Sequence, residues 1–275
     1  MLTLRRCTAI CVDTANHILA EYAARRCAQL CSFQRLLVLS DRALGVPHRQ
    51  IPRLDGTAGY NEFVLTQLLD HVETDHLLIF QWDGFVVHPG AWRNEFLDYD
   101  YVGAPWPAQW VEPGHRVGNG GFSLRSRKLL QAIRDAKLQF DFSAAEDVSI
   151  CRGPHRKVLE EQYGIRFAPP ELANFFSFEH TPIDAPTFGF HADFNFFRVL
   201  PEVELHYILR HVPQSFWQAG KPLRWIRDCW QSGAVDLSLR LFRYCLQRYP
   251  RQPALEAIAG YSVPGLSEAL QQVAA

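Results

Sequence analysis

The 275-residue sequence has no excess of charge of either sign, since 28 lysines and arginines face 29 aspartates and glutamates. A chain this close to neutral has no global field that attracts nucleic acid or an anionic membrane, so an anionic ligand must be held by local groups. No apolar run reaches the roughly 18 residues needed to span a bilayer. The apolar run after residues 1–7 breaks at Asp13 and lacks the cleavage pattern of a signal peptide. We therefore expect a globular, soluble, cytoplasmic protein.

The seven cysteines form no C-x-x-C pair. An odd number of cysteines without that spacing disfavours both a disulfide framework and a zinc site. Free cysteine packs as a small hydrophobe, so we expect buried, reduced thiols. The sequence also lacks the G-K-[ST] ending of a phosphate-binding P-loop, and it contains no internal repeats.

The most informative stretch is residues 76–85, His-Leu-Leu-Ile-Phe-Gln-Trp-Asp-Gly-Phe. Its four consecutive apolar residues predict a strand buried on both faces, which is typical of parallel sheets covered by helices. Gln81 and Asp83 follow at the carboxyl end, where open α/β sheets bind their ligands. Their oxygens suit Mg²⁺ or Mn²⁺, so Asp83 is a candidate metal anchor. The alternative is that Asp83 and Gly84 only form a turn.

Two further strands are expected before this one. Residues 7–12 and 36–39 are predicted strands, and the helical stretch 14–30 between them implies a right-handed parallel crossover. Asp13-Thr14 closes the first strand and Ser40-Asp41 the second, so both pairs would line the edge that carries the candidate metal anchor. Each could equally be part of an ordinary helix cap or turn.

The loop 105–115 carries Trp106 and Trp110 among three prolines. This composition predicts a surface loop that exposes flat aromatic faces, which could stack on a sugar. The alternative is that both rings fold back onto the core, because tryptophan is highly buried on average.

The next stretch, 117–125, reads Val-Gly-Asn-Gly-Gly-Phe-Ser-Leu-Arg. Three glycines around Asn119 allow the backbone to approach a ligand closely and allow positive φ. Ser126 is expected to cap the following helix. A later helix starts with Glu146 and Asp147 in its first turn, where acids favour the helix dipole by about 0.3 to 1 kcal/mol in any case.

Four motifs, in this order along the chain, resemble those of GT-A glycosyltransferases. They are Gln-x-Asp after a strand, the Gly-Asn-Gly-Gly-Phe-Ser-Leu-Arg block, the Glu-Asp pair and Phe-Gly-Phe-His at 188–191. The sequence is similar in particular to an uncharacterised bacterial family placed with these glycosyltransferases, over roughly residues 7–195. The resemblance implies an α/β, Rossmann-like, mostly parallel sheet flanked by helices. Residues 1–198 would be the domain that binds nucleotide sugar and acceptor, and 199–275 a helical C-terminal extension with one long helix over 223–249.

The resemblance also implies roles for the motif residues. Asp83 corresponds to the second acid of a D-x-D motif that holds Mn²⁺ or Mg²⁺ on the donor diphosphate, and His191 would complete the metal shell. Gln81 stands where the family has the first acid, and an amide oxygen coordinates more weakly than a carboxylate. Metal binding is then looser or shared with His191, or the chain is a metal-independent variant. The alternative for His191 is a core histidine.

The Glu-Asp motif supplies the base of inverting members, which indicates Asp147 with Glu146 as its neighbour. The other expected contacts are with the nucleotide, from Thr14, Asp41, Gln81 and Asp83, and with sugar or acceptor, from Trp106, Trp110, Asn119, Gly120 and Gly121.

The sequence thus predicts a metal-dependent, inverting glycosyltransferase that moves a sugar from a nucleoside diphosphate donor to a hydroxyl of a carbohydrate or glycoconjugate acceptor. The missing first acid keeps a second hypothesis open, a sugar-nucleotide or carbohydrate-binding module without turnover. A third is a nucleotidyltransferase that uses the same metal edge. Neither a nucleic-acid partner nor an integral membrane segment is expected.

Overall fold

The computed structural model describes residues 1–181, 185–248, 253, 256–257, 260 and 263–274. The chain forms two compact units, Met1–Ala192 and Asp193–Ala275. The expected division of labour between a catalytic domain, 1–198, and a helical extension, 199–275, remains a prediction.

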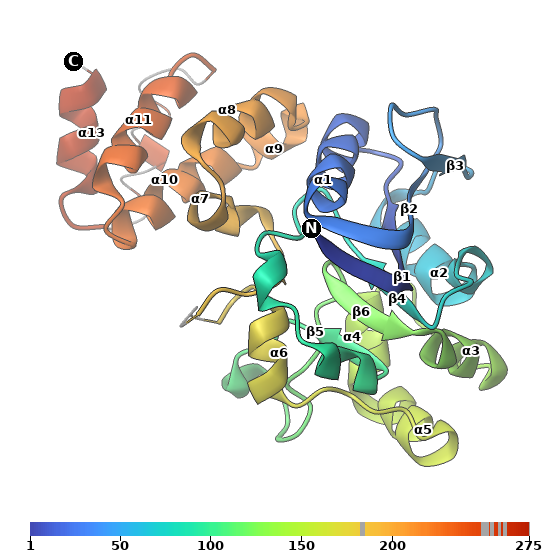
Figure 1. Ribbon diagram of the computed structural model, residues 1–275. Coiled ribbons are helices and arrows are strands. Elements are labelled where there is room, and N and C mark those ends of the chain that lie inside the picture. The colour runs from blue at the N-terminus through green and yellow to red at the C-terminus, as the bar shows by residue number, and fades with distance from the viewer. Residues whose placement is uncertain (182–184, 249–252, 254–255, 258–259, 261–262, 275) are drawn as a thin grey trace. The chain divides into compact units, whose positions relative to one another are not determined.

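The first unit is built on a six-stranded sheet with the strand order β3-β2-β1-β4-β6-β5 (Figure 1). The first four strands along the chain pair in parallel, whereas β6 runs antiparallel to its neighbours β4 and β5. Helices flank this sheet, so the predicted α/β fold with a mostly parallel sheet is confirmed. The strands are β1 (Leu2–Val12), β2 (Cys31–Ser40), β3 (His48–Gln50), β4 (His76–Ile79), β5 (Tyr101–Gly103) and β6 (Ser123–Ser126).

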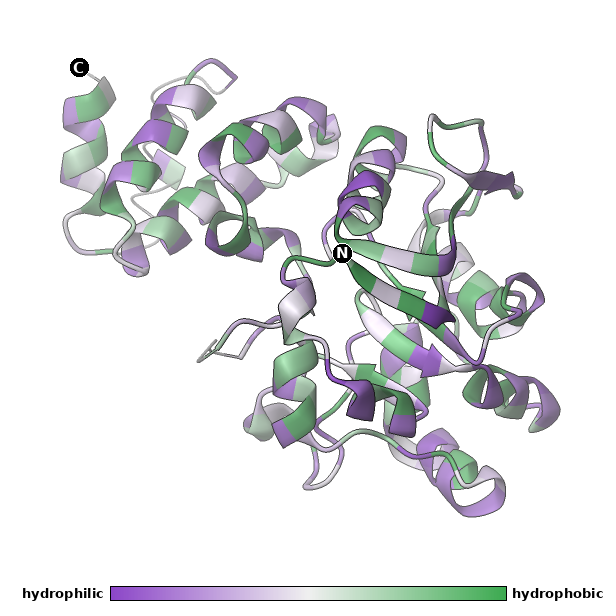
Figure 2. Ribbon diagram, in the orientation of Figure 1, coloured by the Kyte–Doolittle hydropathy of each residue, from purple (hydrophilic) through white to green (hydrophobic). Residues whose placement is uncertain are grey.

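Burial of the middle strands orders the sheet. All four residues of β4 are buried, and the register places Ile79 beside Ile10 of β1, which lies beside Leu37 of β2. These side chains share one apolar core with Phe63 of α2 (Gly56–Thr66). In contrast, the edge strand β3 is short, hydrophilic and exposed (Figure 2), which discourages pairing with other chains.

The first helix, α1 (His17–Leu30), starts later than the expected position 14. The cause is a turn in which one carboxylate oxygen of Asp13 accepts hydrogen bonds from the backbone N–H groups of Ala15 and Asn16, at 2.7 and 2.6 Å. Aspartate commonly closes such turns with its own following backbone. The turn ends β1 and brings the chain around into the helix.

The remaining elements of the first unit are short. The Oγ of Ser126 accepts a hydrogen bond from the N–H of Leu129 at 2.9 Å, so the predicted cap of α3 is confirmed. A second, two-stranded parallel sheet pairs β7 with β8. These elements are η1 (Leu68–His71), η2 (Pro89–Ala91), η3 (Asn94–Asp98), η4 (Ala108–Trp110), α3 (Arg127–Asp135), α4 (Glu146–Cys151), α5 (Gly153–Tyr163), α6 (Pro170–Phe176), β7 (Ser177–Phe178) and β8 (Gly189–Phe190).

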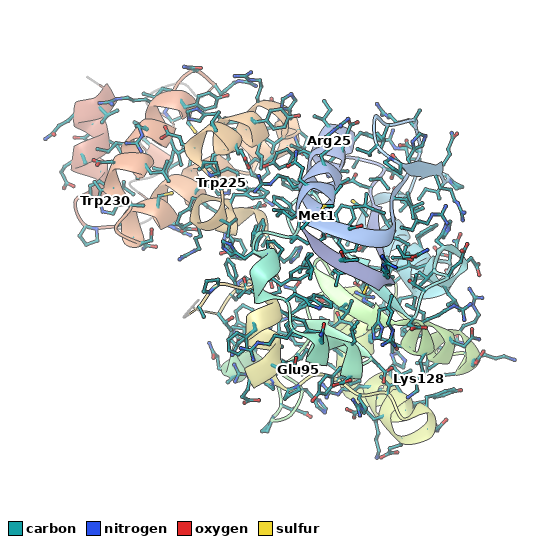
Figure 3. The ribbon with its side chains drawn as sticks, in the orientation of Figure 1. Met1, Arg25, Glu95, Lys128, Trp225 and Trp230 are labelled. Carbon is teal, nitrogen blue, oxygen red and sulfur yellow. The ribbon has the colours of Figure 1, made fainter. Side chains whose placement is uncertain are left out.

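The second unit is helical among its described residues. Trp225, which is labelled in Figure 3, is fully buried in this unit. It packs edge-on against Phe196 and Phe216 and donates from Nε1 to Asp193. The elements are η5 (Asp193–Asn195), α7 (Phe196–Val199), α8 (Glu202–His211), α9 (Gln214–Gln218), α10 (Lys221–Gln231), α11 (Val235–Cys245) and α13 (Leu266–Ala274).

The expectation of one long helix over 223–249 is wrong, although residue 249 lies outside the described residues. Residues 232–234 separate α10 from α11, and Gly233 has a φ of +84°. Glycine populates this left-handed region without the steric penalty of other residues, and the change of backbone direction ends the first helix.

All seven cysteines are buried and free of disulfides, which confirms the expected reduced thiols. Where the structure describes the chain, no helix combines the length and the apolar composition needed to cross a bilayer.

Candidate functional site

A cleft of about 530 Å³ opens in the first unit at the carboxyl ends of β1 and β4. This is the edge at which open α/β sheets bind ligands. The cleft is lined by Val12, Asp13, Thr14, Ala15, Asn16, Leu54, Gly56, Thr57, Tyr60, Asn61, Gln81, Trp82, Asn119, Gly120, Gly121, Ala145, Glu146, Asp147, Glu179 and His191. Segments far apart in the sequence therefore share one cavity.

Of the two pairs predicted at this edge, the pair that follows β1 lines the cleft and the pair at the end of β2 is not among the described lining residues. Thr14 lines the cleft, and its Oγ1 accepts a hydrogen bond from the N–H of Leu54 at 3.1 Å. Asp41 is not among the described lining residues; its carboxylate lies 2.5 Å from Nε2 of His17. Asp13 also lines the cleft. Burial raises the pKa of its carboxyl, and hydrogen bonds from the backbone N–H groups of Asn16 and Ala15 partly offset that rise.

The chain turns sharply after β4. Gln81 and Gly84 exchange two backbone hydrogen bonds, of 2.8 and 3.1 Å, so the Asp83–Gly84 turn exists; Gln81 lines the cleft, whereas Asp83 is not among the described lining residues. The side-chain amide of Gln81 donates to the hydroxyl of Tyr60 at 2.8 Å, which leaves its Oε1 facing Nε2 of His191 at 3.2 Å. The Oδ1 of Asp83 lies 3.8 Å from the same nitrogen. The predicted metal residues thus meet around Nε2.

The other nitrogen of His191 faces a residue that the sequence analysis did not identify. Nδ1 donates to Oε1 of Glu179 at 3.1 Å, and Oε2 of Glu179 accepts from the side-chain amide of Asn119 at 2.5 Å. Burial alone would lower the pKa of His191, but Glu179 and Asp83 favour the protonated ring and raise the pKa to about 9. Burial acts to raise the pKa of the Glu179 carboxyl, but the hydrogen bond from His191 and the charge of its ring hold that pKa below its ordinary value.

A divalent cation fits these donors only together with a substrate. No cluster of three His, Cys, Asp or Glu side chains suited to a metal occurs in the described part of the chain. Asp83 and His191 would supply two ligand atoms, Nε2 of His191 after it loses its proton, and the Gln81 amide oxygen is a third, weaker donor. Mg²⁺ and Mn²⁺ are commonly held by one or two protein groups plus substrate phosphates. A metal-bound histidine also usually donates its other nitrogen to a carboxylate, as His191 does to Glu179.

The glycine loop is held against the side chains of the cleft. A Cβ on Gly120 would lie 1.9 Å from Oε1 of Glu146, and one on Gly121 would lie 2.0 Å from Nε2 of His191. Both glycines are thus needed for close approach, as predicted, but toward protein side chains. The positive φ expected of a glycine belongs to Asn119, at +65°. Asparagine tolerates this region better than most residues.

The two tryptophans predicted to be exposed differ. Trp110 is 51% exposed and its ring contacts that of His180, whereas Trp106 is 6% exposed. The expectation of exposure is therefore wrong for Trp106. Its ring packs where a Cβ on Gly118 would be, with the guanidinium of Arg152 3.8 Å from its centroid. Neither ring is among the described residues that line the cleft, and their binding of sugar stays a prediction.

The adjacent acids at the start of α4 have different partners. Glu146 is buried and forms a two-pronged ion pair with Arg125, at 2.7 and 2.8 Å. Arg125 has no exposed surface; burial acts to lower its pKa, but the charge of Glu146, Tyr101 and the hydrogen bond to Glu146 together raise it above its ordinary value. Asp147 is only half-buried; its Oδ2 accepts from the N–H of Gly120 at 2.9 Å and its Oδ1 from the N–H of Val148 at 2.8 Å.

Sequence reasoning missed Tyr60, Arg125 and Glu179 as site residues. Arg125 lies within the fully buried strand β6, and a buried arginine requires an acidic partner. Glu179 follows a two-residue strand, which is too short to produce a periodic pattern.

The comparisons with known proteins give a family and several weak structural likenesses. A family model described as "Protein of unknown function (DUF5672)" matches residues 48–191, more than half of the chain. A comparison with curated proteins found no match.

Among solved structures, a glucosyl-3-phosphoglycerate synthase from Mycobacterium tuberculosis, in complex with Mn²⁺, uridine-diphosphate-glucose and phosphoglyceric acid, has 14% identity and a TM-score of 0.34. That match covers 46% of this chain and 59% of the synthase, so the chain spans less than two thirds of its length. A mannosyltransferase from Pyrobaculum calidifontis, in complex with GDP-Man and Mn²⁺, has 12% identity and a TM-score of 0.42, and the match covers 98% of this chain and 73% of that one. Likenesses this weak carry no conclusion about the chemistry of this chain.

Proposed function

We propose that this chain, which belongs to the family described as proteins of unknown function DUF5672, is a glycosyltransferase that takes its sugar from a nucleoside diphosphate donor. The observation that supports this most is convergence. Gln81 and His191 are 110 positions apart, and they meet at one cleft with the glycine loop and the Glu146–Asp147 pair. These are the motifs that carry the resemblance to GT-A glycosyltransferases.

We assign the donor to the wall formed after β1 and at the start of α2. Thr14 and Tyr60 line this wall, and the turn with Asp83 follows the neighbouring strand β4. A nucleotide in this position would extend its diphosphate toward Asp83 and His191. A divalent cation bound there would neutralise the charge that grows on the leaving diphosphate.

The transfer itself follows from the position of Asp147. An acceptor hydroxyl oxygen attacks the anomeric carbon, the bond from that carbon to the diphosphate oxygen breaks, and the nucleoside diphosphate leaves. Asp147 removes the proton of the attacking hydroxyl, and the configuration inverts. The N–H groups of Gly120 and Val148 hold the carboxylate in place before substrate arrives. Glu146 is a poorer base because Arg125 occupies both of its oxygens.

A panel assay tests the proposal. The protein is incubated with nucleotide sugars and simple sugar acceptors, in Mn²⁺, in Mg²⁺ and in chelator. Release of nucleoside diphosphate with formation of a glycoside is the expected result. Pyrophosphate release from nucleoside triphosphate and sugar phosphate would instead support the nucleotidyltransferase. Binding of nucleotide sugar without any release would support the non-catalytic module, which the amide at Gln81 in place of an acid favours.

The cation is tested through Asp83. If Asp83 bridges a cation to the donor diphosphate, Asp83→Asn weakens nucleoside diphosphate binding in Mn²⁺ and leaves it little changed in chelator. Calorimetric titration of both proteins under both conditions measures this. Equal affinities of the variant and the parent in Mn²⁺ would remove Asp83 from the site.

A further inference from the structure

We infer that Glu179 is a positioning residue that fixes the ring of His191 so that Nε2 is directed to the cation and the diphosphate; this inference rests on the proposed function. The two residues leave a small parallel sheet side by side. Ser177 pairs with Gly189 and Phe178 with Phe190, and the N–H of His191 donates to the carbonyl of Phe178 at 3.0 Å. The fold of β7 and β8 therefore sets the approach of Glu179 to His191.

The chemistry of a carboxylate makes this contact selective. Both oxygens of Glu179 only accept, so the group opposite each oxygen must present a hydrogen. Oε1 therefore requires Nδ1–H of His191, at 3.1 Å, and the remaining nitrogen, Nε2, faces Oε1 of Gln81 and Oδ1 of Asp83. A carboxylate on the second nitrogen of a metal-bound histidine fixes the ring orientation and raises its basicity as a ligand.

The second oxygen of Glu179 orients Asn119 in the same way. Oε2 accepts from Nδ2 of Asn119 at 2.5 Å, and Nε2 of the more exposed His180 lies 3.5 Å from the same oxygen. The amide of Asn119 must therefore turn its nitrogen to Glu179 and its Oδ1 away. Oδ1 is buried and has no hydrogen-bond partner among the described residues, in a side chain that lines the cleft. A hydroxyl of a bound sugar would supply the missing donor.

The test is Mn²⁺ binding, which does not require turnover. Electron paramagnetic resonance measures the free Mn²⁺ signal as the protein is titrated, with inorganic pyrophosphate present. Removal of such a partner typically weakens metal affinity 10- to 100-fold, so Glu179→Gln is expected to raise the Kd for Mn²⁺ by that factor. The matched control is Glu112→Gln, which alters an exposed glutamate lying 3.8 Å from Nδ1 of His115. It should leave the Kd unchanged.

A double variant separates positioning from mere stability. In Glu179→Gln with Asn119→Asp, the new amide nitrogen can donate to the new carboxylate while the new amide oxygen still accepts from Nδ1 of His191. Aspartate also tolerates the positive φ of position 119. We expect the double variant to recover most of the lost Mn²⁺ affinity, and Asn119→Asp alone, which opposes two carboxylates, to lose it.

The outcomes distinguish this inference from the proposed function. A parental protein that binds no Mn²⁺ with pyrophosphate, or a Glu179→Gln variant that binds as tightly as the parent, overturns the inference even if sugar transfer is observed. If Mn²⁺ binding depends on Glu179 but no nucleotide sugar is turned over, the inference stands and the glycosyltransferase assignment fails. Glu179→Asp, which keeps the charge and shortens the side chain, gives the same comparison if the glutamine variant folds poorly.

Discussion

The two ends of β4 meet histidines in opposite electrostatic environments. His76, at the amino end, is 5% exposed, and its hydrogen bond from Nε2 to the carbonyl of Tyr99 is long, at 3.4 Å. Burial lowers the pKa of His76. At the carboxyl end, His191 is also shielded from solvent, yet Glu179 and Asp83 raise its pKa to about 9. The carboxylates, and not the degree of burial, decide the direction of the shift.

This difference extends to the neighbouring groups. At the amino end, polar side chains form separate pairs. Thr8 is hydrogen-bonded to Thr74, and Asp75 forms an ion pair with Arg6. At the carboxyl end, acids outnumber the cations Arg125 and His191; the acids are Asp13, Asp83, Glu146, Asp147 and Glu179. Concentrated carboxylates repel one another and oppose folding, so their presence in a cleft indicates a function that uses them.

Among the acids at the carboxyl end of β4, we expect the largest effect from Asp147, which is half-buried. A base that acts only in the transition state should, when changed to asparagine, lower kcat with little effect on donor binding. General-base catalysis is typically worth 10² to 10⁴ in rate, so Asp147→Asn is expected to lose at least about a hundredfold. Steady-state kinetics and donor titration measure the two quantities separately. An unaltered kcat would exclude the inverting mechanism based on this acid.

A change at Glu146, which precedes Asp147 in the chain, should lower the free energy of unfolding. Glu146→Gln removes the partner of Arg125, a cation with no exposed surface. Breaking a buried ion pair at one member typically costs about 3 to 5 kcal/mol, because the remaining charge stays buried. Denaturant unfolding measures the loss.

The matched control is Glu161→Gln, which breaks an exposed pair with Lys157 and should cost no more than about 1 kcal/mol. Similar losses in the two variants would show that the Arg125 pair contributes no more than a surface pair.

A substitution in the glycine loop should give a smaller loss of stability than the loss of the Arg125 partner. Gly121→Ala places a methyl group 2.0 Å from Nε2 of His191, so the ring or the loop must shift. Overpacking of this kind typically costs about 1 to 3 kcal/mol. Gly90→Ala is the control, since no atom lies within 4 Å of the new Cβ. Melting temperatures compare the two variants, and a Gly121→Ala protein as stable as the control would mean that the loop yields freely.

The sequence predicted the parts of this site that depend on local patterns. The apolar run 77–80 indicated a buried strand, and its sharp end at Gln81 located the edge of the sheet where the cleft opens. Ser126 was identified as a helix cap because capping depends on residues within one turn. These features depend on neighbours in the chain, which is why a single sequence is sufficient.

The rest of the site depends on long-range contacts. Arg125 and Glu146 are 21 positions apart, and Asn119 and Glu179 are 60 apart, so no spacing rule connects them. Trp106 lies in a proline-rich loop without periodicity, and its burial follows from a tertiary contact with the backbone of Gly118. A pattern cannot reveal which side of a loop meets the core.

The last prediction returns to the amino end of β4 and has the smallest expected effect. The pKa of His76 is lower in the folded protein than its ordinary value because burial disfavours the charged ring. As the pH falls through about 6.5, the unfolded chain therefore binds a proton before the folded one does, so stability is lost below that pH and is independent of this group well above it. His76→Gln, which keeps a donor for the carbonyl of Tyr99 but does not titrate, should reduce the fall in melting temperature between about pH 7 and about pH 5. His48→Gln, at an exposed position, is the control. If both variants retain the parental pH dependence, the environment of His76 is more polar than its burial implies, and the two ends of β4 are less different than proposed.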